Sequence, residues 1–463
     1  MTTESQDLRQ SRVEAACRPR DASAASRWMR AVFWMLLYLL LTALPLVVLL
    51  AGPVPKGGGV AWDFAMALGF GGLSIMGLQF VLTARFRRLT APFGIDIIYL
   101  FHRWAAIGGV ALILGHYLIL RIGYGSALGP ANPWTADWAM TAGRISLGLF
   151  GVLLVTSLWR KQLGLDYDAW RVLHGLMAVI AVGLAMAHIH GVGYYTSGPW
   201  KAAVWGGYSG LWLLALVSIR LLRPLSLLRR PYRVVEVKDE GGASWTVTVK
   251  PERPPALRFR PGQFGWLTLG GSPFRAIEHP FSFSGSAEDA EVLRFTIKEL
   301  GDFTRTIKHV RVGELAYVDG PFGVFTTDYC PRAPGFVMIA GGVGIAPMMS
   351  MLRTLADRGD RRPVHLISGN WRWDAVLFRE ELETLKARLN LKVVHVLQEV
   401  PPGWTGEAGY VTEAILRRNL PDESRNFEHF LCGPKAMTDF VTASLDRMQI
   451  PLHRVHLELF EMA

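Results

Sequence analysis

Four histidines in the N-terminal half of the chain stand at one repeated spacing. His102 and His116 are 14 residues apart, and so are His174 and His188. On an α-helix, 14 residues turn through about 1400°, roughly 40° short of four full turns, so both members of a pair face the same side. They stand about 21 Å apart along the helix axis. Two such helices side by side would offer two facing pairs, and each pair could hold an iron from both sides.

The same residues have a simpler explanation. A single histidine in an apolar helix is more often a hydrogen-bonded interior residue or part of a proton path than a metal ligand. The repeated spacing favours ligation. His190 lies two residues past His188, about 200° around the helix, and is expected at the surface. Because the sequence contains no Cys-x-x-Cys-His, non-covalently bound b haem is favoured over attached haem.

The composition indicates a membrane protein. Of 463 residues, 51% are hydrophobic, only 19% are charged, and 16 are tryptophans, which suits a bilayer and its interfaces. The first apolar stretch is predicted to be a transmembrane helix and not a signal peptide, because no convincing small-residue cleavage site accompanies it. Six stretches are long enough to span, within expected bounds of 31–50, 61–83, 104–121, 143–159, 172–190 and 203–222.

The basic residues predict the direction of the spans. Arginines and lysines gather in the N-terminal tail and in the second-to-third and fourth-to-fifth connections, and are sparse in the others. The positive-inside bias then places both termini in the cytoplasm of a cell (inner) membrane, with the third and fifth spans running outward. His102 and His174 would share the inner level, and His116 and His188 the outer one. The bundle is thus expected to carry electrons across the bilayer.

Charge and cysteine usage exclude other classes. The net charge of +11 is explained by basic residues that flank the spans, so no nucleic-acid partner is expected. The three cysteines, Cys17, Cys330 and Cys432, lie far apart. They predict neither a disulfide framework nor a zinc site. Their sparse use instead predicts that the redox-active half of the chain is cytoplasmic.

The sequence changes character after Arg223-Pro224. Short alternating runs separated by Gly and Pro predict an antiparallel β-barrel, and after Pro334 alternating strands and helices predict a doubly wound parallel sheet. The expected domains are a tail (1–30), a six-helix transmembrane haem-binding domain (31–223), a β-barrel domain (224–332) and an α/β domain (333–463).

A glycine-rich loop follows the first strand of the α/β domain. In the sequence GGVGIAP, Gly341, Gly342 and Gly344 permit a tight turn, and the amino end of the next helix favours a pyrophosphate. Pro347 falls near the first helical turn, where proline is tolerated. A plain strand–helix turn is the alternative.

The order of these features resembles the ferric reductase and NADPH oxidase superfamily. The resemblance covers roughly residues 60 to 463 and implies one FAD, two b haems and a nicotinamide dinucleotide as donor. It rests on the histidine bundle followed by FRPGQF (259–264), HPFSFS (279–284), IKELGDFT (297–304), GPFG (320–323), AGGVGIAPMMSML (340–352), LCGP (431–434) and ELF (458–460).

The resemblance assigns flavin contacts in the barrel domain. It implies that the isoalloxazine is lined by four residues, with the Ser282 hydroxyl near the reactive flavin nitrogen: His279, Pro280, Phe281 and Ser282. It further implies that the flavin pyrophosphate is held at Gly301, Asp302 and Thr304. Ordinary turns at these positions are the alternative.

The resemblance also assigns the nicotinamide end of the site. Cys432 is expected near the hydride-donating carbon, with Gly433 and Pro434 shaping the pocket floor. Phe460 is expected to cover the flavin until nicotinamide displaces it. The alternatives are that the cysteine is small core filler and that the aromatic ring is docked into the core.

Cationic residues suggest further ligand contacts. Arg372 follows the second strand of the α/β domain, where a cation can meet the adenosine 2′-phosphate. It favours NADPH, with NADH possible, although a solvated loop arginine is nearly as good an explanation. Haem propionates have candidate partners near each surface: Arg103, Arg171 and Tyr167 inside, and Arg121, Arg144 and Tyr117 outside. Interfacial anchoring explains them equally well.

The expected function is a transmembrane NAD(P)H oxidase that reduces external O₂ to superoxide. A ferric-chelate reductase would use the same electron path. Haem-free alternatives are a membrane-anchored flavoprotein reductase serving a cytoplasmic partner, and a transporter-like or scaffold protein with degenerate nucleotide sites. The sequence contains no EF-hand loop, and no obligatory protein partner is expected.

Overall fold

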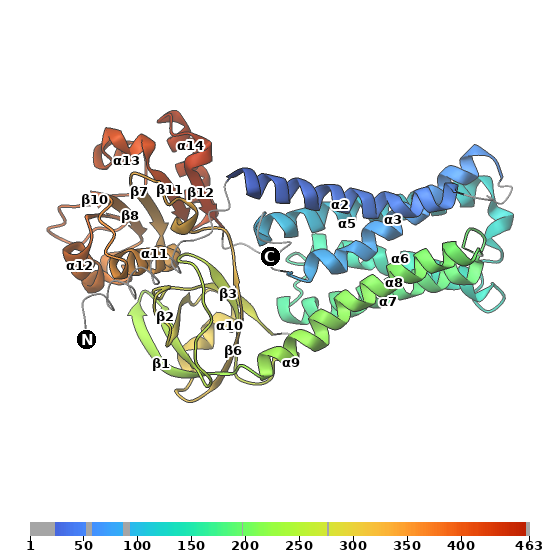
Figure 1. The fold of residues 1–463 in the computed structure, drawn as a ribbon, viewed down its shortest axis with the longest axis horizontal. Coiled ribbons are helices and arrows are strands. Elements are labelled where there is room, and N and C mark those ends of the chain that lie inside the picture. The colour runs from blue at the N-terminus through green and yellow to red at the C-terminus, as the bar shows by residue number, and fades with distance from the viewer. Residues whose placement is uncertain (1–23, 52–57, 87–92, 197, 276, 460–463) are drawn as a thin grey trace, which may run out of the picture. The chain divides into compact units, whose positions relative to one another are not determined.

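The chain folds into two compact units. The computed structural model describes residues 24–51, 58–86, 93–196, 198–275 and 277–459 (Figure 1). One unit is Trp28–Leu225, and the other includes Ser226–Ala463. The division falls two residues beyond the boundary predicted at Arg223-Pro224.

Six helices within the described residues are long and apolar enough to cross a membrane, which confirms the predicted number. They are α2 (Ala24–Leu50), α3 (Val60–Thr83), α5 (Ile95–Gly123), α6 (Trp138–Leu158), α7 (Tyr167–Val192) and α8 (Pro199–Val217).

Each helix begins before the first residue of the predicted span, because an apolar run marks only the apolar length of a helix and not its polar first turn. Asp137 accepts a hydrogen bond from the amide of Ala139 and begins α6, and Asp166 does the same for Ala169 at the start of α7. Residues 24–30, which were assigned to the tail, are helical in α2.

Small residues let the helices of the bundle approach closely. α3 packs along α5, and α6 packs along α7. A Cβ added at Gly72 of α3 would lie 2.9 Å from the carbonyl oxygen of Gly109 in α5, so glycine is needed for this spacing. On α8, three buried rings fill the core of the bundle: Trp205, Tyr208 and Trp212. After α8 the chain passes through a π-helical turn, Ser218–Leu222, into α9 (Arg223–Leu228).

The barrel domain is the predicted antiparallel structure. Its sheet has the order β4-β3-β6-β1-β2-β5, and an antiparallel bridge between Phe283 and Phe295 joins its two edges. Alternating inward side chains form one apolar core. The strands are β1 (Tyr232–Gly241), β2 (Ser244–Pro251), β3 (Phe264–Leu269), β4 (His279–Ser282), β5 (Leu293–Lys298) and β6 (Leu315–Phe322).

The α/β domain is the predicted doubly wound parallel sheet. The strand order is β10-β9-β8-β7-β11-β12. The domain has two hydrophobic cores. Helices α11 (Ile345–Asp357) and α12 (Arg379–Arg388) pack into one, and α13 (Glu413–Asn419) and α14 (Lys435–Arg447) pack into the other. The strands are β7 (Phe336–Gly341), β8 (Val364–Asn370), β9 (Leu391–Leu397), β10 (Glu407–Ala408), β11 (Glu428–Cys432) and β12 (Val455–Glu458).

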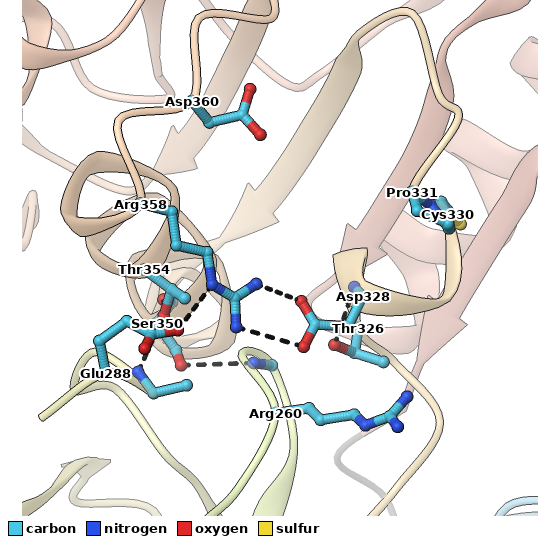
Figure 2. A network of polar contacts seen from close by, with 12 residues as sticks. Arg260, Glu288, Thr326, Asp328, Cys330, Pro331, Ser350, Thr354, Arg358 and Asp360 are labelled. Carbon is cyan, nitrogen blue, oxygen red and sulfur yellow. Dashed lines mark hydrogen bonds and ion pairs between the residues drawn. The ribbon is translucent and has the colours of Figure 1, made fainter. Parts of the chain in front are cut away.

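Helix α11 docks the α/β domain onto the barrel through a polar stripe (Figure 2). Ser350, Thr354 and Arg358 recur every four residues and so lie on one face of α11. The Ser350 hydroxyl accepts a hydrogen bond from the amide of Gly262, and the Thr354 hydroxyl accepts one from the amide of Ala287. Arg358 pairs with two carboxylates, those of Glu288 and Asp328. These contacts fix the two domains against each other.

We predict that Thr354→Val destabilises this docking. Thr354 is fully buried, and its loss leaves the partly buried amide of Ala287 without its acceptor, at a cost of about 1 kcal/mol. Thermal unfolding of the purified chain in detergent measures the change. Thr384→Val is the matched control, because this exposed hydroxyl bonds only within its own helix. Equal melting temperatures for the two variants would contradict the prediction.

Candidate functional site

The outer histidine pair faces one cavity in the helical bundle. His116 of α5 and His188 of α7 both line a cavity of about 320 Å³, and the two imidazoles interact electrostatically. The remaining lining is mostly apolar and comes from α3, α5, α6 and α7 and from the segments that follow α5 and α7. The sequence-derived pairing of His116 with His188 is therefore present in the structure.

Each outer imidazole is held by a backbone carbonyl of the neighbouring helix. The Nδ1 atom of His116 lies 2.8 Å from the carbonyl oxygen of Ala65 in α3, and the Nδ1 atom of His188 lies 2.8 Å from that of Ala139 in α6. A carbonyl only accepts, so Nδ1 carries the hydrogen and Nε2 keeps its lone pair. Metal-ligating histidines are held in this way. The donor set therefore fits an axially ligated haem iron.

A glycine lies beside each of these imidazoles. Gly69 and Gly143 each stand four residues after the accepting alanine, one turn further along the same helix face. A Cβ at Gly69 would lie 2.9 Å from His116 Nδ1, and one at Gly143 would lie 2.8 Å from His188 Nδ1. The two helix pairs thus use the same local arrangement, in which the ring rests against a bare backbone.

The inner pair is also brought together but is held differently. His102 and His174 interact electrostatically. The Ser157 hydroxyl lies 3.3 Å from Nδ1 of His174, and the Trp170 ring lies 5.0 Å from the His174 ring. Nδ1 of His102 is buried and makes no hydrogen bond with any described residue. The inner imidazoles therefore lack the symmetric carbonyl support seen at the outer level.

The structure adds one cation that the sequence analysis missed. Arg220 lies in the π-helical turn, and its Nη2 atom would be 2.6 Å from a Cβ at Gly175, the residue after His174. A guanidinium group therefore lies close to the backbone of the residue that follows the inner histidine. The sequence carries no signal for it, because a π-helical turn changes which residues share a face.

The predicted propionate partners differ in placement. Tyr117 and Arg144 line the outer cavity, although Arg144 also donates hydrogen bonds to the carbonyl oxygens of Leu128 and Pro130. Arg103 and Arg121 are exposed. Arg171 lies over the ring of Tyr167, 6.0 Å from its centroid. These assignments remain predictions.

The predicted flavin strand carries a stack of aromatic rings. The ring of His279 in β4 stacks on Phe303 of α10 (Asp302–Arg305) at 3.9 Å, and Phe281 stacks on the same ring at 6.1 Å. Pro280 pairs with Trp266 of β3, and the Ser282 side chain is buried. Phe303 was not predicted as a site residue, although it lies within the quoted IKELGDFT motif.

The predicted pyrophosphate segment is internally bonded in this structure. The Thr304 hydroxyl accepts hydrogen bonds of 2.8 Å from the amides of Leu300 and Gly301. Asp302 is exposed, 4.0 Å from Arg305. A phosphate held here would have to replace these local bonds, so the predicted role of Thr304 stays a prediction.

The α/β domain and the barrel share a second cavity, of about 600 Å³. Gly341, Gly342 and Pro434 line it from the α/β domain, and Ser244 and Lys298 line it from the barrel. It opens at the carboxyl edge of the parallel sheet, where nucleotides bind in such folds. Lys298 was missed by the sequence analysis, although it stands within the quoted IKELGDFT motif, and it offers a cation beside the glycine loop.

The glycine loop and the LCGP segment touch through their backbones. A Cβ at Gly344 would lie 2.2 Å from the carbonyl oxygen of Cys432, and one at Gly433 would lie 3.0 Å from the amide nitrogen of Gly341. Pro347 is buried in the first turn of α11. The two segments expected to form one nucleotide site are therefore brought together.

The structure does not place the remaining predicted residues, Cys432, Arg372 and Phe460, in the lining of the nucleotide cavity. Cys432 is fully buried, and this burial raises the pKa of its thiol well above the ordinary value; it does not line the nucleotide cavity. Arg372 is more than half exposed and pairs with Asp374 at 3.4 Å, while its neighbour Trp371 lines the cavity. Phe460 lies outside the described residues.

Two protein families match separate parts of the chain. Residues 68–185 match the ferric reductase like transmembrane component, a stretch that contains His102, His116 and His174 but ends before His188. Residues 338–443 match the oxidoreductase NAD-binding domain.

Individual relatives match the C-terminal half. NADH-cytochrome b5 reductase 1 of Candida albicans is 38% identical over 143 residues, 30% of this chain and 48% of that protein. NADH–cytochrome b5 reductase 1 of Arabidopsis thaliana is 32% identical over 168 residues, 35% of this chain and 59% of that protein. The chain spans about half the length of the curated relatives it matches.

Among solved structures, the chain is similar to a flavohemoglobin from Malassezia yamatoensis, with 18% identity and a TM-score of 0.46 over 86% of this chain and 96% of that one. It is also similar to the flavohem-like FAD/NAD binding domain of a nitric oxide dioxygenase from Vibrio cholerae, with 24% identity and a TM-score of 0.45 over 50% and 98%.

The family matches and the fold agree on the order of the parts. Six membrane-spanning helices come first, and a β-barrel and an NAD-binding domain follow. The chain therefore has the architecture of the ferric reductase and NADPH oxidase superfamily, a multi-pass membrane protein with a ferric reductase like transmembrane component and an oxidoreductase NAD-binding domain.

Proposed function

We propose that this protein is a transmembrane NAD(P)H oxidase, which takes electrons from cytoplasmic NADPH and delivers them to O₂ on the opposite side, giving superoxide. The observation that carries the proposal is the outer pair, His116 and His188, each fixed by a carbonyl so that Nε2 is left for a metal. When bound, FAD accepts hydride and releases single electrons, which two b haems can carry one at a time.

The bundle residues hold and tune the iron sites in this proposal. His102 with His174, and His116 with His188, would hold the two haem irons. The carbonyls of Ala65 and Ala139 orient the outer rings and raise their basicity. Arg220 beside the inner level and Arg144 beside the outer one offer guanidinium groups that suit carboxylates such as propionates.

The α/β domain and the barrel position the nucleotide. The backbone of the loop from Gly341 to Gly344 opens α11 at its amino end, where amides and the helix dipole favour a pyrophosphate. Lys298 adds a cation from the barrel side. The docking stripe on α11 keeps the barrel and the α/β domain in fixed register, which is needed for hydride to pass between two bound rings.

The membrane orientation is part of the proposal. The arginine-rich connections on one side of the bundle support a cytoplasmic location for both termini, in a cell (inner) membrane. The two dehydrogenase domains would then lie on the side where nicotinamide nucleotides are available. No nucleic acid or obligatory protein partner is needed for this activity.

A ferric-chelate reductase is the second candidate. The match to a ferric reductase like transmembrane component over residues 68–185 favours it. The residues that would hold FAD, the nucleotide and the haems are the same for both acceptors. A haem-free flavoprotein reductase serving a cytoplasmic partner is the candidate from a different class, and it leaves the four histidines without a role.

We predict that His116→Leu and His188→Leu each remove about one of about two haems per chain, because each variant leaves the outer iron with a single protein ligand. Haem and FAD are measured on the purified chain by absorbance after extraction. His190→Leu is the matched control, since this exposed neighbour lies on another helix face. Full haem content in all variants would support the haem-free candidate.

We predict that Arg372→Ala raises KM for NADPH by about ten-fold and leaves KM for NADH unchanged, because only NADPH carries the 2′-phosphate. Arg417→Ala on α13 serves as the control, because its charge pairs with Glu413 instead. Equal changes for the two nucleotides would show that Arg372 does not read this phosphate.

We predict that NADPH oxidation by the purified protein reduces cytochrome c in a manner abolished by superoxide dismutase. Parallel assays with ferric chelates in place of oxygen distinguish the second candidate. Dismutase-insensitive reduction together with faster turnover on ferric chelates would assign the protein as a ferric reductase.

A further inference from the structure

Three potential metal ligands converge near the amino edge of the parallel sheet, away from the carboxyl edge that holds the nucleotide cavity. They are Cys330, Glu428 and His456, and their ligand atoms all lie within 4.8 Å of one another. Nε2 of His456 is 3.6 Å from Sγ of Cys330 and 2.8 Å from Oε2 of Glu428. All three side chains are partly buried.

The spacing is close to what a tetrahedral cation needs. Zinc–sulfur and zinc–nitrogen bonds of about 2.3 and 2.0–2.1 Å, at tetrahedral angles, separate the two ligand atoms by about 3.6 Å. The distance between Cys330 and His456 equals this value. The oxygen of Glu428 would have to move outward by about half an ångström, which a side-chain rotation supplies.

The three ligands come from separate segments that are each held in place. His456 lies in β12 and stacks on Phe430 of β11 at 4.7 Å, two residues from Glu428. Cys330 lies in the segment between the barrel and the α/β domain (Figure 2), where Nη1 of Arg362 donates a hydrogen bond to its carbonyl oxygen. The donor atoms therefore converge because the fold positions them.

A neighbouring arginine helps to position the Glu428 carboxylate. Nη1 of Arg454 lies 3.4 Å from Oε1 of Glu428, while His456 contacts Oε2. The arginine and the histidine thus hold the carboxylate through its two different oxygens. A thiolate, an imidazole and a carboxylate together suit zinc better than magnesium or calcium, which prefer oxygen ligands.

We propose that Cys330, Glu428 and His456 bind a Zn²⁺ ion, with a fourth position left for water. The bound cation ties the segment between the two domains to strands β11 and β12. It is separate from the nucleotide cavity, which none of the three residues lines. The site would therefore brace the base of the α/β domain and take no part in hydride transfer.

The test uses the full chain in detergent with its natural cofactors. After treatment with a chelator and removal of the chelator, the protein is titrated with Zn²⁺ against a chromophoric competitor, and zinc is counted by mass spectrometry. We expect about one tightly bound zinc per chain. Cys330→Ser, Glu428→Gln and His456→Gln should each weaken binding by about ten-fold or more, while the exposed-histidine control His309→Gln should not.

X-ray absorption at the zinc edge identifies the ligands directly. The proposal requires one sulfur at about 2.3 Å together with nitrogen and oxygen neighbours, and loss of that sulfur in Cys330→Ser. Retained FAD shows that each variant is folded; if Cys330→Ser loses its FAD, Glu428→Gln decides. Zinc binding of unchanged strength in the folded ligand variants, or a zinc environment without sulfur, overturns the proposal.

Discussion

The bundle depends on one repeated interaction, the contact between an imidazole Nδ1 and a backbone carbonyl on the neighbouring helix. At the outer level it occurs twice, from His116 to Ala65 and from His188 to Ala139. The carbonyl selects the tautomer and fixes the plane of the ring. A glycine one turn further on leaves room for the ring beside the helix. Helix packing, ring orientation and ligand chemistry are therefore determined together.

The unit that contains the barrel and the α/β domain has two groups of candidate ligand-binding residues, at the two edges of one sheet. At the carboxyl edge, the loop after β7 and the segment after β11 meet through glycine backbones and open the nucleotide cavity. Near the amino edge, Glu428 and His456 meet Cys330. Helix α11 begins at the first edge, and its polar stripe holds the barrel. The nucleotide cavity and the Cys330–Glu428–His456 cluster therefore share no residue.

Much of this organisation is visible in the sequence, because it depends on periodicity. The 14-residue spacing put each histidine pair on one helix face, apolar length gave six spans, and alternation gave a barrel followed by a parallel sheet. The helix starts were missed because polar capping residues such as Asp137 and Asp166 lie outside the apolar runs.

Contacts between distant segments could not be predicted in this way. Arg220 comes close to Gly175 from a π-helical turn that follows another helix, and Phe303 reaches His279 through the fold of the barrel. The separation of the three cysteines predicted no zinc site. Yet Cys330 is joined by His456, 126 residues away, and no spacing rule connects those positions.

The central claim is that two irons are each held between two imidazoles inside the membrane bundle. Low-temperature electron paramagnetic resonance of the oxidised, purified protein tests it most directly, because two axial imidazoles make ferric haem low-spin. Two low-spin ferric signals, together accounting for about two haems per chain, are predicted. A high-spin ferric signal from five-coordinate haem, or the absence of any haem signal, would contradict it.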